Sequence, residues 1–165
     1  MKNLLFSFFI VCTLMLSCRS QEESLQQIDQ VIQLYIDSLG QDMLNDKLPG
    51  SYKNPQINDV YGLTDNAPIT STLKKDTDTL NYLEYVAGAT RVKIDSSAAG
   101  KTYESKIAIN FTKKINDSVN RTINDTMTIQ YRSTPDIFQV WTVWYNGQIK
   151  FTKIEGAPNI VKISK

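Results

Sequence analysis

Residues 103–115 read YESKIAINFTKKI, and their alternation of apolar and polar side chains is the strongest fold signal in the chain. The large apolar members share one parity: Tyr103, Ile107, Ile109, Phe111 and Ile115. The polar residues between them lie mostly on the other parity. A period of two sustained over this length is typical of a β-strand with one face in the core and one face in water.

The next stretch, residues 122–131, reads TINDTMTIQY and repeats the pattern. Its apolar positions again share one parity: Ile123, Met127, Ile129 and Tyr131. The connector between the two stretches, residues 116–121, is short and polar, as a hairpin requires. The sequence therefore predicts two neighbouring antiparallel strands.

Asn146-Gly147 marks a second hairpin, between strands expected at 138–145 and 148–154. Both central residues of a type I′ turn have positive φ, which Asn and Gly tolerate better than other residues. Residues 82–95, with a bend allowed at Gly88, and 160–163 add further strand signals. We therefore predict a four- to five-stranded antiparallel meander sheet.

Residues 22–44 show a different period, with apolar side chains at steps of three and four. The stripe consists of Leu25, Ile28, Ile32, Tyr35, Leu39 and Met43. This spacing predicts one long N-terminal helix that ends before Pro49-Gly50. Residues 45–80 are expected to form a folded connector, with room for a short second helix. The expected fold class is α+β, with the helix packed on the sheet in a single domain over 25–165.

The order of one long helix followed by a meander resembles the cystatin-like and NTF2-like arrangements. In those folds a long helix lies across a curved antiparallel sheet. The Gln-x-Val-x-Gly inhibitory loop of cystatins is absent from this sequence. The resemblance therefore implies a fold and no function.

Composition excludes several kinds of chemistry. The chain has 18 Lys+Arg against 17 Asp+Glu, and this near-neutral balance argues against a nucleic-acid partner. It contains no His, and its two Cys lie at Cys12 and Cys18. Ser-His-Asp and Cys-His catalysis and ordinary zinc sites are therefore excluded, and we expect no metal or cofactor. Gly100-Lys101-Thr102 resembles the end of a phosphate-binding loop, but Asp95 occupies the position of its first Gly.

The first residues predict export. One positive charge at Lys2 precedes an apolar run that is too short to span a membrane and fits a signal peptide over 1–17. The run ends in Leu14-Met15-Leu16-Ser17-Cys18, which resembles the lipobox of bacterial lipoproteins. That resemblance implies cleavage after Ser17, lipidation of Cys18 and a membrane partner held through the lipid anchor.

Residues 18–24 are expected to form a polar tether. Gln21-Glu22-Glu23 resembles the surface-export signal of lipoproteins in the Bacteroidota, and a plain solvated tether is the alternative. The expected location is the bacterial cell envelope, in the outer membrane. The sequence leaves open which leaflet and which face carry the protein.

Three aromatic residues crowd the 138–145 strand: Trp141, Trp144 and Tyr145. Strict alternation places Trp141 and Tyr145 on one face with Val143, and Trp144 on the other. An exposed aromatic pair can bind a sugar or a protein partner. The alternative is that the strand is covered on both sides.

The remaining candidate chemistry is a carboxylate pair, Glu84 and Glu104, on neighbouring expected strands. Two close carboxylates can hydrolyse a glycosidic bond. Our prediction is instead a non-catalytic binding or accessory domain, not an enzyme, with an unknown protein or polysaccharide partner. The alternatives are an immunity or inhibitor protein against a secreted toxin and a carboxylate-dependent polysaccharide hydrolase.

Overall fold

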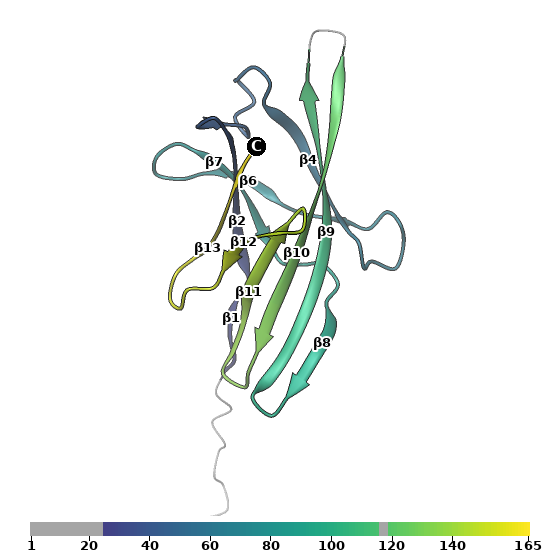
Figure 1. Ribbon diagram of the computed structural model, residues 1–165, viewed down its shortest axis with the longest axis vertical. Coiled ribbons are helices and arrows are strands. Elements are labelled where there is room, and N and C mark those ends of the chain that lie inside the picture. The colour runs from purple at the N-terminus through teal and green to yellow at the C-terminus, as the bar shows by residue number, and fades with distance from the viewer. Residues whose placement is uncertain (1–24, 116–118) are drawn as a thin grey trace, which may run out of the picture.

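The computed structural model describes residues 25–115 and 119–165, and within them every regular element is a β-strand (Figure 1). The signal peptide over 1–17, the tether over 18–24 and Cys18 lie outside these residues. The strands form two sheets of eight and five strands, called here the large sheet and the small sheet. The chain is therefore an all-β protein, and the α+β prediction is wrong.

The large sheet has the order β1-β11-β10-β9-β4-β5, with β12 beside β11 and β8 beside β9. Its strands are β1 (Gln27–Asp29), β4 (Tyr52–Asp59), β5 (Pro68–Ile69), β8 (Val92–Ser97), β9 (Gly100–Lys114), β10 (Asn120–Ser133), β11 (Ile137–Tyr145) and β12 (Gln148–Thr152). The consecutive strands β8 to β12 pair antiparallel in chain order. β1 adds to β11 in parallel.

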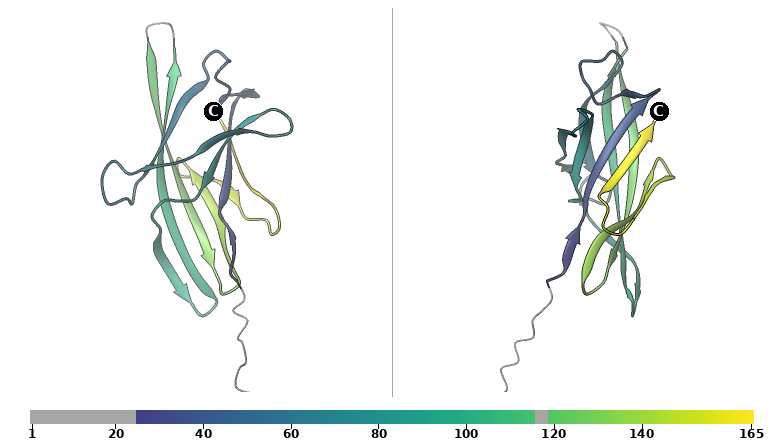
Figure 2. Two further views of the ribbon diagram at one scale, coloured as in Figure 1. Left: turned by 180° about the vertical axis from the view of Figure 1, so that it is seen from behind. Right: turned by 90° about the vertical axis from the view of Figure 1, so that its left-hand side faces the viewer.

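The small sheet has the order β13-β2-β7-β6, with β3 beside β2. Its strands are β2 (Val31–Ser38), β3 (Gln41–Asp42), β6 (Thr72–Lys75), β7 (Asn81–Val86) and β13 (Asn159–Ser164). β13 and β2 are parallel neighbours although they come from opposite ends of the described chain, as the right-hand view of Figure 2 shows. The predicted strand at 160–163 is thus confirmed, with a partner far away in sequence.

The expected helix over 22–44 is replaced by β1, β2 and β3. In β2 the buried residues are Ile32, Leu34 and Ile36, a period of two that the apolar stripe at helical spacing had concealed. Leu25 and Leu39, two members of that stripe, are fully exposed. β2 is flanked by β7 and β13, so its backbone groups pair with two strands. The element order behind the cystatin-like and NTF2-like resemblance is therefore absent from the described residues.

The expected connector over 45–80 contributes strands too: β4 and β5 in the large sheet and β6 in the small sheet. The stretch 82–95 is divided between the sheets, with β7 in the small one and β8 in the large one. In contrast, the alternation predicted for β9 and β10 is confirmed, since Ile107, Ile109, Met127 and Ile129 are all buried.

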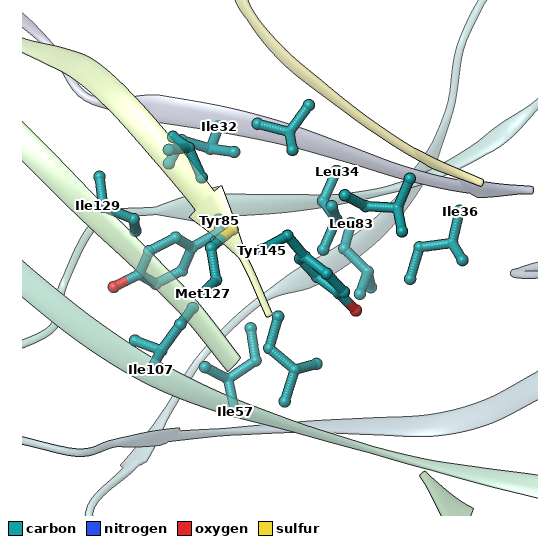
Figure 3. Packing of buried hydrophobic residues seen from close by; sticks show 14 of the residues in the cluster. Ile32, Leu34, Ile36, Ile57, Leu83, Tyr85, Ile107, Met127, Ile129 and Tyr145 are labelled. Atoms are coloured by element: carbon teal, nitrogen blue, oxygen red, sulfur yellow. The ribbon is translucent and has the colours of Figure 1, made fainter. Parts of the chain in front are cut away.

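One apolar core lies between the sheets (Figure 3). The small sheet contributes Ile32, Leu34 and Ile36 from β2 and Leu83 and Tyr85 from β7, and the large sheet faces them with residues of β4, β9, β10 and β11. Each fully buried aliphatic or aromatic side chain contributes about 1.5–3 kcal/mol of transfer free energy. This core holds the large sheet as a fixed platform whose other face, called here the outer face, points away from the small sheet.

Polar residues also join the sheets. The side chain of Lys153 is only 1% exposed and forms an ion pair with Asp29. Its ammonium also donates to the carbonyl of Ala157 at 2.7 Å and to Asn159 Oδ1 at 3.0 Å. Asn159 in turn donates to Asp29 Oδ1 at 2.8 Å and to the carbonyl of Val31 at 3.0 Å. This network fastens the start of β13 to the end of β1 and the start of β2.

Candidate functional site

The aromatic strand β11 is interrupted by a β-bulge at Trp141. Thr142 pairs with Gln130 and Val140 pairs with Tyr131, so Trp141 has no partner of its own on β10. A bulge adds one residue to a strand and shifts the alternation beyond it. Val140, Val143 and Tyr145 consequently belong to the core, whereas the two tryptophans lie at partly exposed positions between them.

The bulge places Trp141 and Trp144 on the outer face and Tyr145 in the core. The strict alternation expected from the sequence, with Trp141 and Tyr145 on one face, is therefore wrong. Tyr145 is 2% exposed, and its hydroxyl donates to Asp125 Oδ2 at 2.8 Å. Burial, followed by this hydrogen bond, raises the pKa of Tyr145 above its usual value. Tyr145 is a core residue and is not available to a ligand.

The two indoles have different neighbours. The guanidinium carbon of Arg132 lies 5.2 Å from the centre of the Trp141 ring, a cation–π distance. Trp144 faces Thr128 on β10 and the exposed Ile149 on β12. Thr142, between the tryptophans, is only 8% exposed. The outer face around β11 therefore presents aromatic rings beside a charged side chain.

A cavity of about 240 Å³ adjoins Trp141 and is lined by residues of the β8–β9 hairpin. Figure 1 shows this hairpin at one end of the large sheet. The cavity is called here the Arg132 cavity. Its lining comes from the β8–β9 hairpin on one side and from β10 and β11 on the other, and it includes Asp95, Ser97, Thr102, Arg132 and Trp141. Lys101 also borders it, but this residue pairs with Ser133 and has the core-face parity of Ile107. Thr102 on β9 pairs directly with Arg132 on β10, so these two residues lie one strand spacing apart.

Gly100 fixes the position of this hairpin. Its φ is +146°, and an added Cβ would lie 2.6 Å from the carbonyl oxygen of Ser133. Only Gly adopts that backbone conformation without strain and allows so close an approach. The segment that resembled a phosphate-binding loop is thus the start of strand β9 and forms one wall of the Arg132 cavity.

The carboxylate pair expected from the sequence is not assembled. Glu84 lies in the small sheet and Glu104 in the large sheet. Glu84 forms an ion pair with Lys74 at 2.6 Å, and Glu104 accepts a hydrogen bond from the Tyr61 hydroxyl at 2.8 Å. These two carboxylates therefore have separate partners in separate sheets.

A second cavity, of about 530 Å³, is lined by both Asp59 and Glu84. Asp59 is engaged with the backbone, because its two carboxylate oxygens accept the amides of Tyr61 at 3.0 Å and Thr90 at 2.7 Å. Within residues 25–115 and 119–165, no cluster of three or more acidic side chains is placed to hold a metal ion.

Comparisons with known proteins do not assign the chain to a group, since no protein-family model, no curated protein and no solved structure matches it. In the part of the chain that the structure describes, no helix is long and apolar enough to cross a membrane.

Sequence reasoning missed Arg132 and the 95–102 hairpin as parts of a site. The alternation of β10 did carry a signal for Arg132, because it shares the polar parity of Thr128 and Gln130. The bulge at Trp141 has no signal in the sequence, since no Gly, Asn or Pro marks it. Without that bulge the two tryptophans could not be assigned to one face.

Proposed function

We propose that the protein is a cell-envelope lipoprotein, anchored through lipidated Cys18, whose β-sandwich is a non-catalytic binding or accessory module. The binding surface in this proposal is the outer face of the large sheet around Trp141 and Trp144. The observation that carries it is the bulge in β11, which turns both tryptophans of the chain away from the core. Indoles outside a core are favourable contacts for sugars and protein partners, because they bury a large area with few rotatable bonds.

The first experiment compares what the full-length, lipidated protein retains from its own cells with what a Trp141→Ala/Trp144→Ala double variant retains. Tyr35→Ala is the matched control, because Tyr35 is a partly exposed aromatic residue in the small sheet, where it stacks on Tyr82. Thermal unfolding confirms that each variant is folded. We expect the wild type and Tyr35→Ala to retain the same polysaccharide or protein and the double variant to lose it.

Equal retention by the double variant would contradict the assignment of the surface. A secreted toxin among the retained proteins would direct the proposal toward an immunity protein, whereas an envelope polysaccharide would direct it toward a glycan-binding module.

The anchor is tested separately, with a Cys18→Ala variant and a metabolic palmitate label. We expect the wild type to carry the label and to sediment with the membranes, and the variant to carry none. Labelling of the variant to the same extent would contradict lipidation at Cys18. Protease treatment of intact cells then decides the face: digestion of the domain supports surface exposure, and protection supports an internal position in the envelope.

A further inference from the structure

A row of side chains crosses the strands on the outer face of the large sheet. Residues that pair directly on neighbouring strands have their side chains on the same face. Glu104 on β9 pairs with Gln130 on β10, and Gln130 pairs with Thr142 on β11. The row, called here the Glu104 row, ends at Val92 on β8 and at Thr152 on β12. It spans four strand spacings, or about 19 Å.

Aromatic side chains adjoin the Glu104 row at two points. The hydroxyl of Tyr61 donates to Glu104 Oε1 at 2.8 Å. In β11, Trp141 directly precedes Thr142, and Trp144 is the next residue with its side chain on the outer face. Since β9 and β11 are two strand spacings apart, about 10 Å separates these two points. An occupant that contacts both is therefore an extended molecule that lies along the row.

The middle of the Glu104 row is suited to hydroxyl groups. One carboxylate oxygen of Glu104 accepts the hydrogen bond from Tyr61. Among the described residues, no hydrogen bond is found to its other oxygen or to the side-chain amide of Gln130, and both side chains are half-buried. A carboxylate accepts hydrogen bonds, and an amide both donates and accepts them, so together they match the hydroxyls of a sugar.

The charges around the Glu104 row nearly cancel. Strand register places the cations Lys106 and Arg132 on the outer face together with the carboxylates Glu104 and Asp95. Glu155 joins them, because its carboxylate accepts a hydrogen bond from β11 at 3.0 Å. Two cations against three carboxylates give no excess positive charge that would attract an acidic partner, and the carboxylate within the row itself repels one. This balance favours a neutral occupant.

We propose that the Glu104 row binds a neutral polysaccharide, whose sugar rings contact Tyr61 and the two tryptophans and whose hydroxyls bond to Glu104 and Gln130. This inference rests on the proposed function, because it names the ligand class of the same surface. A protein partner fits less well, because the centre of a protein interface is depleted of charged residues, whereas this row has a carboxylate and an amide between its aromatic neighbours.

The test uses the full-length lipidated protein in phosphatidylcholine vesicles, which float in a density gradient. Fluorescent laminarin, glucomannan and amylose are the neutral probes. The same polymers with their primary hydroxyls oxidised to carboxylates are the matched acidic controls, because the backbone is kept. A further probe is the labelled neutral polysaccharide fraction of the protein's own cells, prepared by proteinase digestion and anion exchange. Vesicles without protein give the background.

We expect at least one neutral polysaccharide to float with the vesicles and its oxidised form to bind about tenfold more weakly. Glu104→Gln should weaken binding of the neutral form by about three- to tenfold, because a neutral amide is a poorer acceptor than a carboxylate. The same variant should strengthen binding of the oxidised form, since it removes a like charge. A purely structural role of Glu104 would instead change both forms equally.

Glu84→Gln is the matched control, because Glu84 is a half-buried carboxylate in the small sheet. It should leave the binding of both forms unchanged. Thermal unfolding confirms that each variant is folded.

Three results would overturn the inference. Equal or stronger flotation of the oxidised form with the wild type would show that the surface does not select a neutral ligand. Equal changes for both forms, or no change, in Glu104→Gln would remove Glu104 from the site. Flotation of none of the neutral probes, including the cellular fraction, would end the neutral-polysaccharide inference, whereas tryptophan-dependent retention of a protein in the cell-extract experiment would still support the proposed function.

Discussion

Lys153→Met tests the buried network that joins the two ends of the described chain. Methionine has nearly the volume of lysine, so the change removes the ammonium without opening a large cavity. The wild-type ammonium has three acceptors: Asp29, the carbonyl of Ala157 and Asn159. All three lose the ammonium as a donor in the variant, and Asp29 keeps the hydrogen bond from Asn159.

Removing one partner of a buried ion pair destabilises a protein by about 3–5 kcal/mol, because the other charge is left uncompensated. The side chain of Asp29 is 31% exposed, so water partly compensates its carboxylate in the variant. We therefore expect the lower end, about 3 kcal/mol. With a urea m-value of about 2 kcal/mol/M, the midpoint of unfolding should fall by about 1.5 M.

The assay is urea unfolding followed by circular dichroism, with Lys150→Met as the matched control. Lys150 is exposed on β12, and its substitution should change stability by less than about 0.5 kcal/mol. A double-mutant cycle of Lys153→Met with Asp29→Asn should give a coupling free energy of at least about 1 kcal/mol. If Lys153→Met were no more destabilising than Lys150→Met, the link between β1 and β13 would be wrong.

Two further predictions concern other parts of the molecule. Burial alone would raise the pKa of Asp125, but hydrogen bonds led by that from Lys165 lower this pKa below its usual value. The stability that the carboxylate contributes should therefore be complete above about pH 4 and be lost as the pH falls through the lower folded-state pKa. Acid unfolding of Asp125→Asn should lack this pH dependence. Gly100→Ala should lower the free energy of unfolding by about 1–3 kcal/mol in urea titrations, because its Cβ meets the Ser133 carbonyl; an unchanged midpoint would contradict this packing.

The parts of the fold that could be predicted from sequence are those set by local patterns. The alternation of apolar and polar residues was sufficient to predict β9 and β10, because each strand has one buried face and one face in water. The turn at Asn146-Gly147 could be predicted because its backbone requires two positive φ angles, and the structure has +49° and +78° there.

The N-terminal strand could not be predicted in the same way. Ile32 and Ile36 are compatible with a helical stripe and with a strand face, since a spacing of four satisfies both periods. The choice between helix and strand depends on β7 and β13, which pair with β2 and lie far from it in sequence. The β-branched Val31, Ile32 and Ile36 favour a strand, but that preference is weak without its neighbours.

The candidate site was predictable only in part. The cluster of aromatic residues in β11 was visible in the sequence, whereas their sorting into core and surface depends on a bulge that forms where β11 meets β10. Arg132 and the 95–102 hairpin join Trp141 only through the pairing of β8, β9, β10 and β11.

The most direct test of the account is the fluorescence of the protein, because the chain has two tryptophans and both lie on the proposed surface. Acrylamide quenching of the full-length protein is measured with and without the partner that it retains from its own cells, and Trp144→Phe leaves Trp141 as the sole emitter. The account predicts a blue shift of the emission and reduced quenching on saturation with that partner. Saturated binding with unchanged emission and quenching would place the ligand elsewhere and contradict the account.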